Sequence, residues 1–244
     1  DGEMRVEKQR LNWPILEAVC DAAEEIGIAR TEDCNRGDNE GAGYFPVTQK
    51  GGVRWNARKA FLEPARKRPN LRVETNAHVE RLVLDGRRVS GLVFSQNGET
   101  KRIAVRREVV MAAGAIGTPQ ILQLSGLGPA GVLKQHGIEV VHELPGVGEN
   151  LQDHLQIRTI FRISGARTLN EMSQSRFGQA RIGLEYLLRR SGPMAMAPSQ
   201  LGIFTKSDPS FETANIEYHV QPLSLDAFGE PLHAFPAITV SVCN

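Results

Sequence analysis

The chain has 244 residues, enough for one large domain or two ordinary ones, and its hydrophobic share of 41% and charged share of 23% are typical of globular proteins. The 29 Lys and Arg residues balance 28 Asp and Glu residues, and a net charge of +1 disfavours nucleic acid and an anionic membrane as partners. No segment approaches the roughly 18 consecutive apolar residues of a membrane-spanning helix, so we predict no membrane span.

The cysteines Cys20, Cys34 and Cys243 are odd in number, widely spaced and outside any C-x-x-C motif. This pattern predicts neither a disulfide framework nor a metal site. It favours a reducing compartment, so we expect a cytoplasmic protein, while peripheral membrane association of a longer parent protein stays open.

The first elements in chain order are two helices. Asn12 can cap a helix that has Pro14 in its first turn and that Gly27 can end. Its apolar residues recur at helical spacing: Ile15, Leu16, Val19, Ala22, Ala23 and Ile26. A polar, Gly-rich stretch follows, and residues 56–66 predict a second helix that Pro64 breaks or bends.

Short β-rich runs separated by turn signals come next. The turn signals are Asp85-Gly86 and Asn97-Gly98, and the runs lie at 71–75, 79–84, 89–95 and 101–105. This pattern predicts an antiparallel meander. Residues 108–112 predict one more, buried strand that runs into Ala-Ala-Gly-Ala, a stretch with almost no side chain that a flat cofactor can approach.

A helix is expected next, with Thr118 as its cap, Pro119 at its first position and Gly126 at its end. The following G-L-G-P-A-G has dinucleotide-binding spacing. That fingerprint must open a helix after a strand, whereas here the first Gly closes a helix and Pro129 removes an N–H. We therefore predict a helix–helix corner at this point.

The second half of the chain predicts four more strands and one long helix. Alternating apolar residues over 155–163 are typical of a half-buried strand, and residues 170–190 predict an amphipathic helix. Three further strands are expected at 201–206, 215–221 and 237–242.

Two strings carry a family resemblance. Residues 114–128 read GAIGTPQILQLSGLG and residues 145–154 read PGVGENLQDH, and both resemble the glucose–methanol–choline (GMC) oxidoreductases. The first string matches the family's second signature at every constrained position: Gly114, Ala115, Thr118, Pro119, Ile121, Leu122, Ser125, Gly126, Leu127 and Gly128. The likeness spans most of residues 40–160 in the family's order, and it is loose beyond about Arg190.

The resemblance implies a fold, a cofactor and an activity. Members bind FAD on a Rossmann-like domain and oxidise an alcohol, passing hydride to the flavin. We expect a mixed α/β (α+β) fold, with a partial FAD/NAD(P)-binding Rossmann-like domain that contains the meander, and part of an antiparallel-sheet substrate-binding domain. Residues 1–154, including a helical and loop insert over 1–70, are assigned to the first domain and residues 155–244 to the second.

The resemblance also implies site residues. The strand Val that matches Val79 contacts the adenine by its backbone in such proteins, and the turn that matches Ala113 and Gly114 lies against the adenosine part of FAD. The family's N-terminal strand–G-x-G-x-x-G–helix unit and its catalytic His region have no counterpart here. We expect an internal piece of a longer enzyme, with no catalytic residue of its own, a base C-terminal to Asn244, weak or absent FAD binding and no turnover alone.

Other candidate residues are set aside. The six histidines lack metal-ligand spacing; His154 is the best placed of them, yet the family uses its segment as a link between domains. Ser125 lacks the strand–elbow–helix context of a hydrolase nucleophile.

Two alternatives to a flavoenzyme piece remain. One is a noncatalytic module that keeps the fold for binding or assembly, and the other is a different two-domain FAD or NAD enzyme. The small-molecule substrate stays open between choline, a simple or aromatic alcohol and a polyol. We also expect the chain to self-associate, because missing strands would leave apolar edges exposed.

Overall fold

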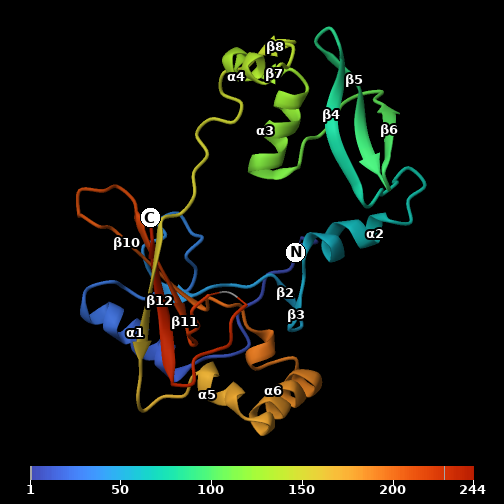
Figure 1. Ribbon diagram of the computed structural model, residues 1–244. Helices are drawn as coiled ribbons and strands as arrows, with labels where there is room; N and C mark the ends of the chain where they lie inside the picture. Colours follow the sequence, from blue (N-terminus) through green and yellow to red (C-terminus); the bar gives the residue numbers. More distant parts are fainter. Residues whose placement is uncertain (1, 228) are drawn as a thin grey trace. The chain divides into compact units, whose positions relative to one another are not determined.

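The computed structural model describes residues 2–227 and 229–244, which form two compact units (Figure 1). The first unit consists of residues 1–68 together with 154–244, and the second of residues 69–153. Residues 1–68 thus share a unit with the C-terminal segment. The sequence predicted a partial FAD-binding domain over 1–154 and a partial substrate-binding domain over 155–244. These two functional assignments stay predictions.

The first unit is built on a five-stranded antiparallel sheet with the strand order β1-β10-β11-β12-β9. Its strands are β1 (Gly41–Tyr44), β9 (Gln156–Arg162), β10 (Leu201–Thr205), β11 (Ile216–Gln221) and β12 (Ala237–Cys243). The four strands predicted in the second half of the chain are confirmed. Strand β1 was not predicted, because its Gly-rich sequence is typical of a loop. It forms by pairing with β10.

Helix α1 (Pro14–Glu25) covers one face of this sheet. Its buried face contacts the inward side chains of β1, β10 and β11 in a single hydrophobic cluster: Trp13, Leu16, Cys20, Ala23, Ala42, Leu201, Ile203 and Val220. The predicted cap at Asn12 is wrong. The cap position belongs to Trp13, which is extended (φ −118°, ψ 125°) because Pro14 at the first helical position disfavours a helical conformation before it.

The first unit contains further elements, most of them short. They are β2 (Gln49–Lys50), β3 (Val53–Arg54), a π-helical turn (Arg58–Leu62), α2 (Glu63–Ala65), α5 (Leu169–Gln174), α6 (Arg176–Arg189) and a 3-10 turn (Pro193–Ala195). The predicted continuous helix over 170–190 is wrong at Ser175. This residue is extended and caps α6, its hydroxyl accepting a hydrogen bond from the Gly178 N–H at 3.0 Å.

The second unit contains the predicted meander: β4 (Ala77–Asp85), β5 (Arg88–Gln96) and β6 (Glu99–Ala104). The turns are confirmed, with Gly86 and Gly98 at φ +55° and +80°. The strands predicted at 71–75 and 108–112 are wrong. A strand needs a paired neighbour, and no other described residue pairs with either run; Val110 is 80% exposed.

Helix α3 (Gly114–Leu124) begins five residues earlier than predicted, so Pro119 lies inside it and Thr118 is not its cap. The end at Gly126 (φ +80°) agrees with the prediction. The predicted helix–helix corner is also confirmed, because α4 (Ala130–Gln135) follows after the two-residue strand β7 (Leu127–Gly128). Strand β7 pairs in parallel with β8 (His142–Glu143).

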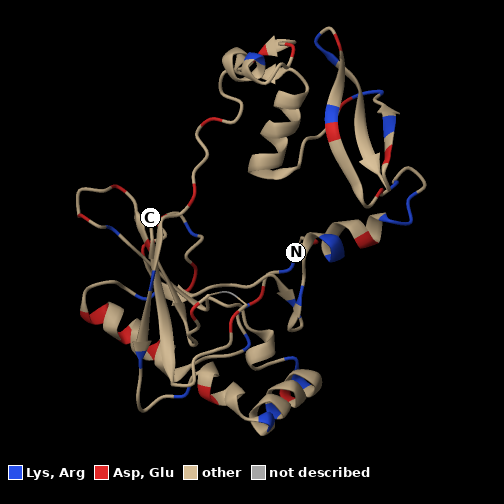
Figure 2. Cartoon of the chain, viewed as in Figure 1, with Lys and Arg blue, Asp and Glu red and all other residues tan. Residues whose placement is uncertain are grey.

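The architecture confirms a mixed α/β fold with antiparallel sheets. Figure 2 colours the ribbon by residue type, and Lys and Arg alternate with Asp and Glu along both units, in keeping with the net charge of +1. Among the described residues no helix is both long and apolar enough to cross a membrane.

Candidate functional site

The first candidate site lies at the start of α3, where the predicted cofactor contacts Ala113 and Gly114 are found. The Ala113 N–H donates a hydrogen bond to the Thr118 hydroxyl at 3.1 Å, which fixes the turn into the helix. Gly114 adopts φ +83°, and a Cβ built there would meet nothing within 4 Å. The chain thus presents bare backbone to open space, and a flat group can approach it closely.

A groove of about 690 Å³ runs beside this turn. Its walls are one side of α3 and the segment over 146–152, both in the second unit. The Gln123 side chain holds the walls together by donating a hydrogen bond to the Val147 carbonyl at 3.1 Å. Gly148 (φ +88°) allows the close approach, because a Cβ there would lie 2.9 Å from the Gln123 amide nitrogen. The groove is therefore preformed and lined partly by backbone.

The third predicted contact, Val79, lies on β4, half-buried and paired with Phe94 just before an irregularity in the ladder. Strand β4 packs against α3. A hydrogen bond from the Leu82 N–H to the Ser125 hydroxyl at 2.8 Å joins these two elements. The structure thus brings together the two elements that carry the three residues. Their contact with FAD stays a prediction.

The serine and histidine residues that the sequence analysis rejected as catalytic candidates have hydrogen-bonding partners nearby. Ser125 is buried, and besides accepting from Leu82 it donates to the Ile121 carbonyl at 2.5 Å. The His154 Nδ1 lies 3.2 Å from the backbone oxygen of Asn244. His233 lies within hydrogen-bond distance of the Ser224 hydroxyl and of an Asp226 carboxylate oxygen, at 3.0 and 3.1 Å.

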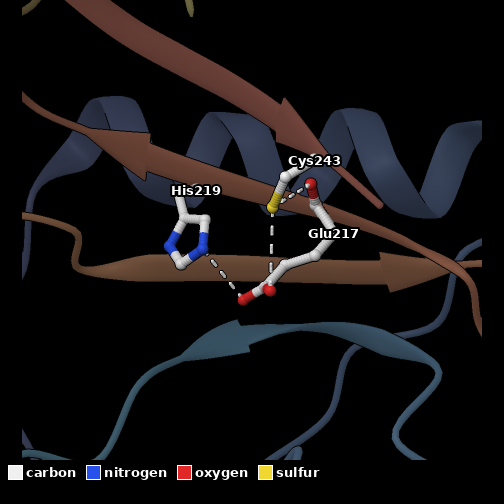
Figure 3. A group of neighbouring side chains, drawn as sticks. All are labelled: Glu217, His219 and Cys243. Atoms are coloured by element: carbon white, nitrogen blue, oxygen red, sulfur yellow. Dashed lines mark hydrogen bonds and ion pairs between the residues drawn. The ribbon is translucent and has the colours of Figure 1, made fainter. Parts of the chain in front are cut away.

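The second candidate site lies on the face of the five-stranded sheet opposite α1, where Glu217, His219 and Cys243 meet (Figure 3). The His219 Nε2 is 3.1 Å from Glu217 Oε1, and the Cys243 thiol is 3.9 Å from Glu217 Oε2. Burial, and then the nearby Glu217 carboxylate, raise the pKa of the Cys243 thiol.

Sequence reasoning missed this second cluster. In a strand over 215–221, residues two apart such as Glu217 and His219 lie on one face. The register that sets Cys243 directly opposite Glu217 in β12 is a tertiary property. No spacing in the sequence encodes it.

Comparisons with known proteins agree with this architecture. The family model for GMC oxidoreductase matches residues 1–156. Human mitochondrial choline dehydrogenase is 39% identical over 222 residues, which cover 91% of this chain and 37% of that protein. An alcohol dehydrogenase [acceptor] from Pseudomonas putida is 34% identical over 247 residues, covering 100% of this chain and 45% of its own length. An FAD-dependent oxidoreductase from Chaetomium thermophilum superposes with a TM-score of 0.83 at 21% identity, over 99% of this chain and 48% of that one.

The antiparallel sheet under one helix, the meander and the glycine-led helix thus form the same fold as that oxidoreductase. The chain belongs to the GMC oxidoreductase family. It spans less than half the length of the relatives it matches.

Proposed function

We propose that this chain is part of an FAD-dependent enzyme that oxidises the CH–OH group of an alcohol, choline or another primary alcohol, to an aldehyde. The observation that carries the proposal is the open backbone of Gly114 beside the preformed groove of the second unit. Two of the relatives support the reaction class, since one is a choline dehydrogenase and one an alcohol dehydrogenase.

The residues present fit the adenosine part of FAD. A flat ring needs a surface without side chains, which Ala113 and Gly114 offer, and a wall, which α3 and the segment over 146–152 offer. Val79 would contribute its backbone from β4. When bound, FAD supplies the hydride acceptor of the reaction. The chain's own part is to hold and orient one end of the cofactor.

The remaining chemistry is proposed to reside elsewhere in the parent protein. The catalytic base belongs to a region beyond Asn244, and the pyrophosphate-binding unit precedes Asp1. Proton transfer by a positioned base contributes about 10²–10⁴-fold, so the 244 residues alone should not turn over. The three free thiols, all buried, support a reducing compartment such as the cytoplasm.

A titration of the purified chain with FAD, followed by flavin anisotropy, tests the cofactor site. We expect weak binding that Gly114→Ala weakens further, because its methyl group projects into the open space and strains φ +83°. Gly137→Ala is the matched control: Gly137 also has a positive φ, +69°, and open surroundings, but it does not line the groove.

Equal losses of FAD binding in the two variants would contradict the assignment of Gly114. Tight stoichiometric binding to the unaltered chain would contradict the proposal that the main flavin site lies elsewhere. The reaction itself is tested on the full-length parent, by alcohol-dependent reduction of an artificial electron acceptor with choline and simple primary alcohols. A flavin-loaded parent that oxidises no alcohol overturns the proposed function.

A further inference from the structure

The cluster on the polar face of the first unit's sheet unites three side chains of different ligand chemistry. Glu217 and His219 are two residues apart on β11, so both point to the same face, and Cys243 stands directly opposite Glu217 on β12. Figure 3 shows the imidazole and the thiol both facing the Glu217 carboxylate. One nitrogen, one sulfur and one oxygen ligand atom lie within 4.8 Å of one another.

These separations match those between the ligands of a tetrahedral ion. Zn²⁺ binds His nitrogen at about 2.0–2.1 Å, carboxylate oxygen at about 2.0–2.2 Å and thiolate sulfur at about 2.3 Å, which places neighbouring ligands about 3.4–3.6 Å apart. The Nε2–Oε1 distance is 3.1 Å and the Sγ–Oε2 distance is 3.9 Å. The two distances involve different oxygens of the Glu217 carboxylate, and one ligand atom of each residue lies within 4.8 Å of the others, so rotations of these side chains would bring all three around one ion.

The surroundings favour a cation. The Phe45 ring lies 5.6 Å from the His219 ring and in edge contact with Phe204, and it covers the sheet at Gly202, where a Cβ would lie 2.2 Å from that ring. Aromatic side chains therefore limit access of water to one side of the cluster, which strengthens electrostatic interactions within it.

We infer that Glu217, His219 and Cys243 form a binding site for a thiophilic divalent cation such as Zn²⁺. Three protein ligands leave a fourth tetrahedral position for water, as in zinc sites that stay open to an exogenous molecule. Binding displaces the thiol proton to solvent and replaces the contact between His219 Nε2 and Glu217 Oε1. The ion links β11 to β12, so it stabilises the sheet.

The test is a Co²⁺ titration of the reduced, metal-free 244-residue chain. We expect a thiolate-to-cobalt charge-transfer absorption that saturates at one equivalent and disappears when Zn²⁺ is added. Zn²⁺ at about 100 times its Kd should raise the thermal midpoint of the first unit by roughly 5–10 °C. Trp13 and Trp55 both lie in that unit, so tryptophan fluorescence follows its unfolding.

Matched variants identify the ligands. Cys243→Ser should abolish the charge-transfer band, and His219→Ala should weaken Co²⁺ binding by more than about 100-fold, the upper loss seen for residues that only support a ligand. Cys34→Ser is the control: Cys34 is also buried, and burial is the main cause that raises the pKa of its thiol, but it lies outside the cluster. It should keep the band.

Two results overturn the inference. One is the absence of a charge-transfer band in the unaltered chain whose far-ultraviolet circular dichroism is that of a folded protein. The other is a band that survives in a folded Cys243→Ser chain or that depends on Cys34. Circular dichroism of each variant separates loss of a ligand from loss of the fold.

Discussion

The Leu82 backbone N–H donates a hydrogen bond to the Ser125 hydroxyl at 2.8 Å, although 43 residues separate the two in the sequence. Ser125 is 7% exposed and directly follows α3, while Leu82 lies in the middle of β4. The same hydroxyl donates to the Ile121 carbonyl at 2.5 Å. One side chain therefore fastens the helix that carries Gly114 to the strand that carries Val79.

Replacing this serine should loosen the second unit. Ser125→Ala leaves the buried Leu82 N–H without a partner, and we expect the free energy of unfolding to fall by about 1–3 kcal/mol. Urea unfolding followed by circular dichroism measures the loss. The tryptophan signal comes from the first unit alone and should not shift, and Thr100→Ala, at an exposed position of β6, should change the stability by at most about 0.5 kcal/mol. A tryptophan transition that shifts with Ser125→Ala would contradict a role confined to the second unit.

The turn between β2 and β3 offers a test of close backbone contact. Gly51 and Gly52 both have positive φ, +60° and +73°, as a type I′ hairpin turn requires. A Cβ at Gly52 would lie 2.1 Å from the Arg190 carbonyl oxygen, whereas a Cβ at Gly51 would meet nothing within 4 Å. The cost of a methyl group should therefore differ sharply between two adjacent glycines.

We expect Gly51→Ala to destabilise the first unit by about 1–2 kcal/mol, the cost of a left-handed conformation. Gly52→Ala adds a steric term of about 1–3 kcal/mol and should cost roughly 2–5 kcal/mol in total. Tryptophan fluorescence in urea measures both, since Trp55 follows the turn directly. Equal losses in the two variants would show that Arg190 does not contact the turn.

The core under α1 makes the first unit sensitive to alkali. Burial is the main cause that raises the pKa of the Cys20 thiol above its ordinary 9.0 and that of the Tyr44 phenol above its ordinary 10.0. Above these values the unfolded chain releases protons that the folded chain retains. The unfolded state then binds fewer protons, so the free energy of unfolding falls as pH rises above about 9.

Tyr44→Phe removes one of these groups and keeps its ring. We expect the variant to lose less stability than the unaltered chain between about pH 10 and 11, while both lose the thiol contribution above about pH 9. Urea unfolding at a series of pH values, followed by tryptophan fluorescence, measures how steeply the free energy of unfolding falls with pH in each protein. Identical slopes would mean that the Tyr44 hydroxyl is solvated in the folded chain.

Local signals predicted the parts of the fold in which neighbours in sequence are neighbours in space. The turns at Gly86 and Gly98 fixed the meander, because a tight turn determines which strands pair. A strand was also expected over 215–221, and in the structure Val220 is buried while His219 faces the other side of the sheet. The family motif located Gly114 by residue identity alone.

The remaining parts of the fold and of the candidate site depend on pairing between strands that are far apart in the sequence. Strand β1 is rich in glycine and exists because β10, which starts at residue 201, pairs with it. The apolar run over 108–112 has the composition of a strand but no paired neighbour among the described residues. The metal-ligand cluster needs Cys243 in register with Glu217, a relationship across 26 residues that only the sheet establishes.

Exposed apolar side chains on the first unit predict that the chain associates with itself. On α6, Phe177 is 80%, Leu187 69% and Leu188 74% exposed. Strand β9 is the last strand in the order of its sheet and exposes Ile157 by 64%. Apolar surface of this kind and a strand at the end of a sheet both favour association with a second copy.

Light scattering over a range of protein concentrations should therefore give a mass that rises above that of one chain. Replacing Leu187 and Leu188 together by Glu should lower it, because charges at these positions oppose burial in an interface. Gln179→Glu, an exposed position of α6 occupied by a polar residue, adds charge without removing apolar surface and should leave the association unchanged. A monodisperse monomer at all concentrations would contradict self-association through these exposed side chains. If both variants lowered the mass equally, the association would depend on net charge rather than on the apolar side chains of α6.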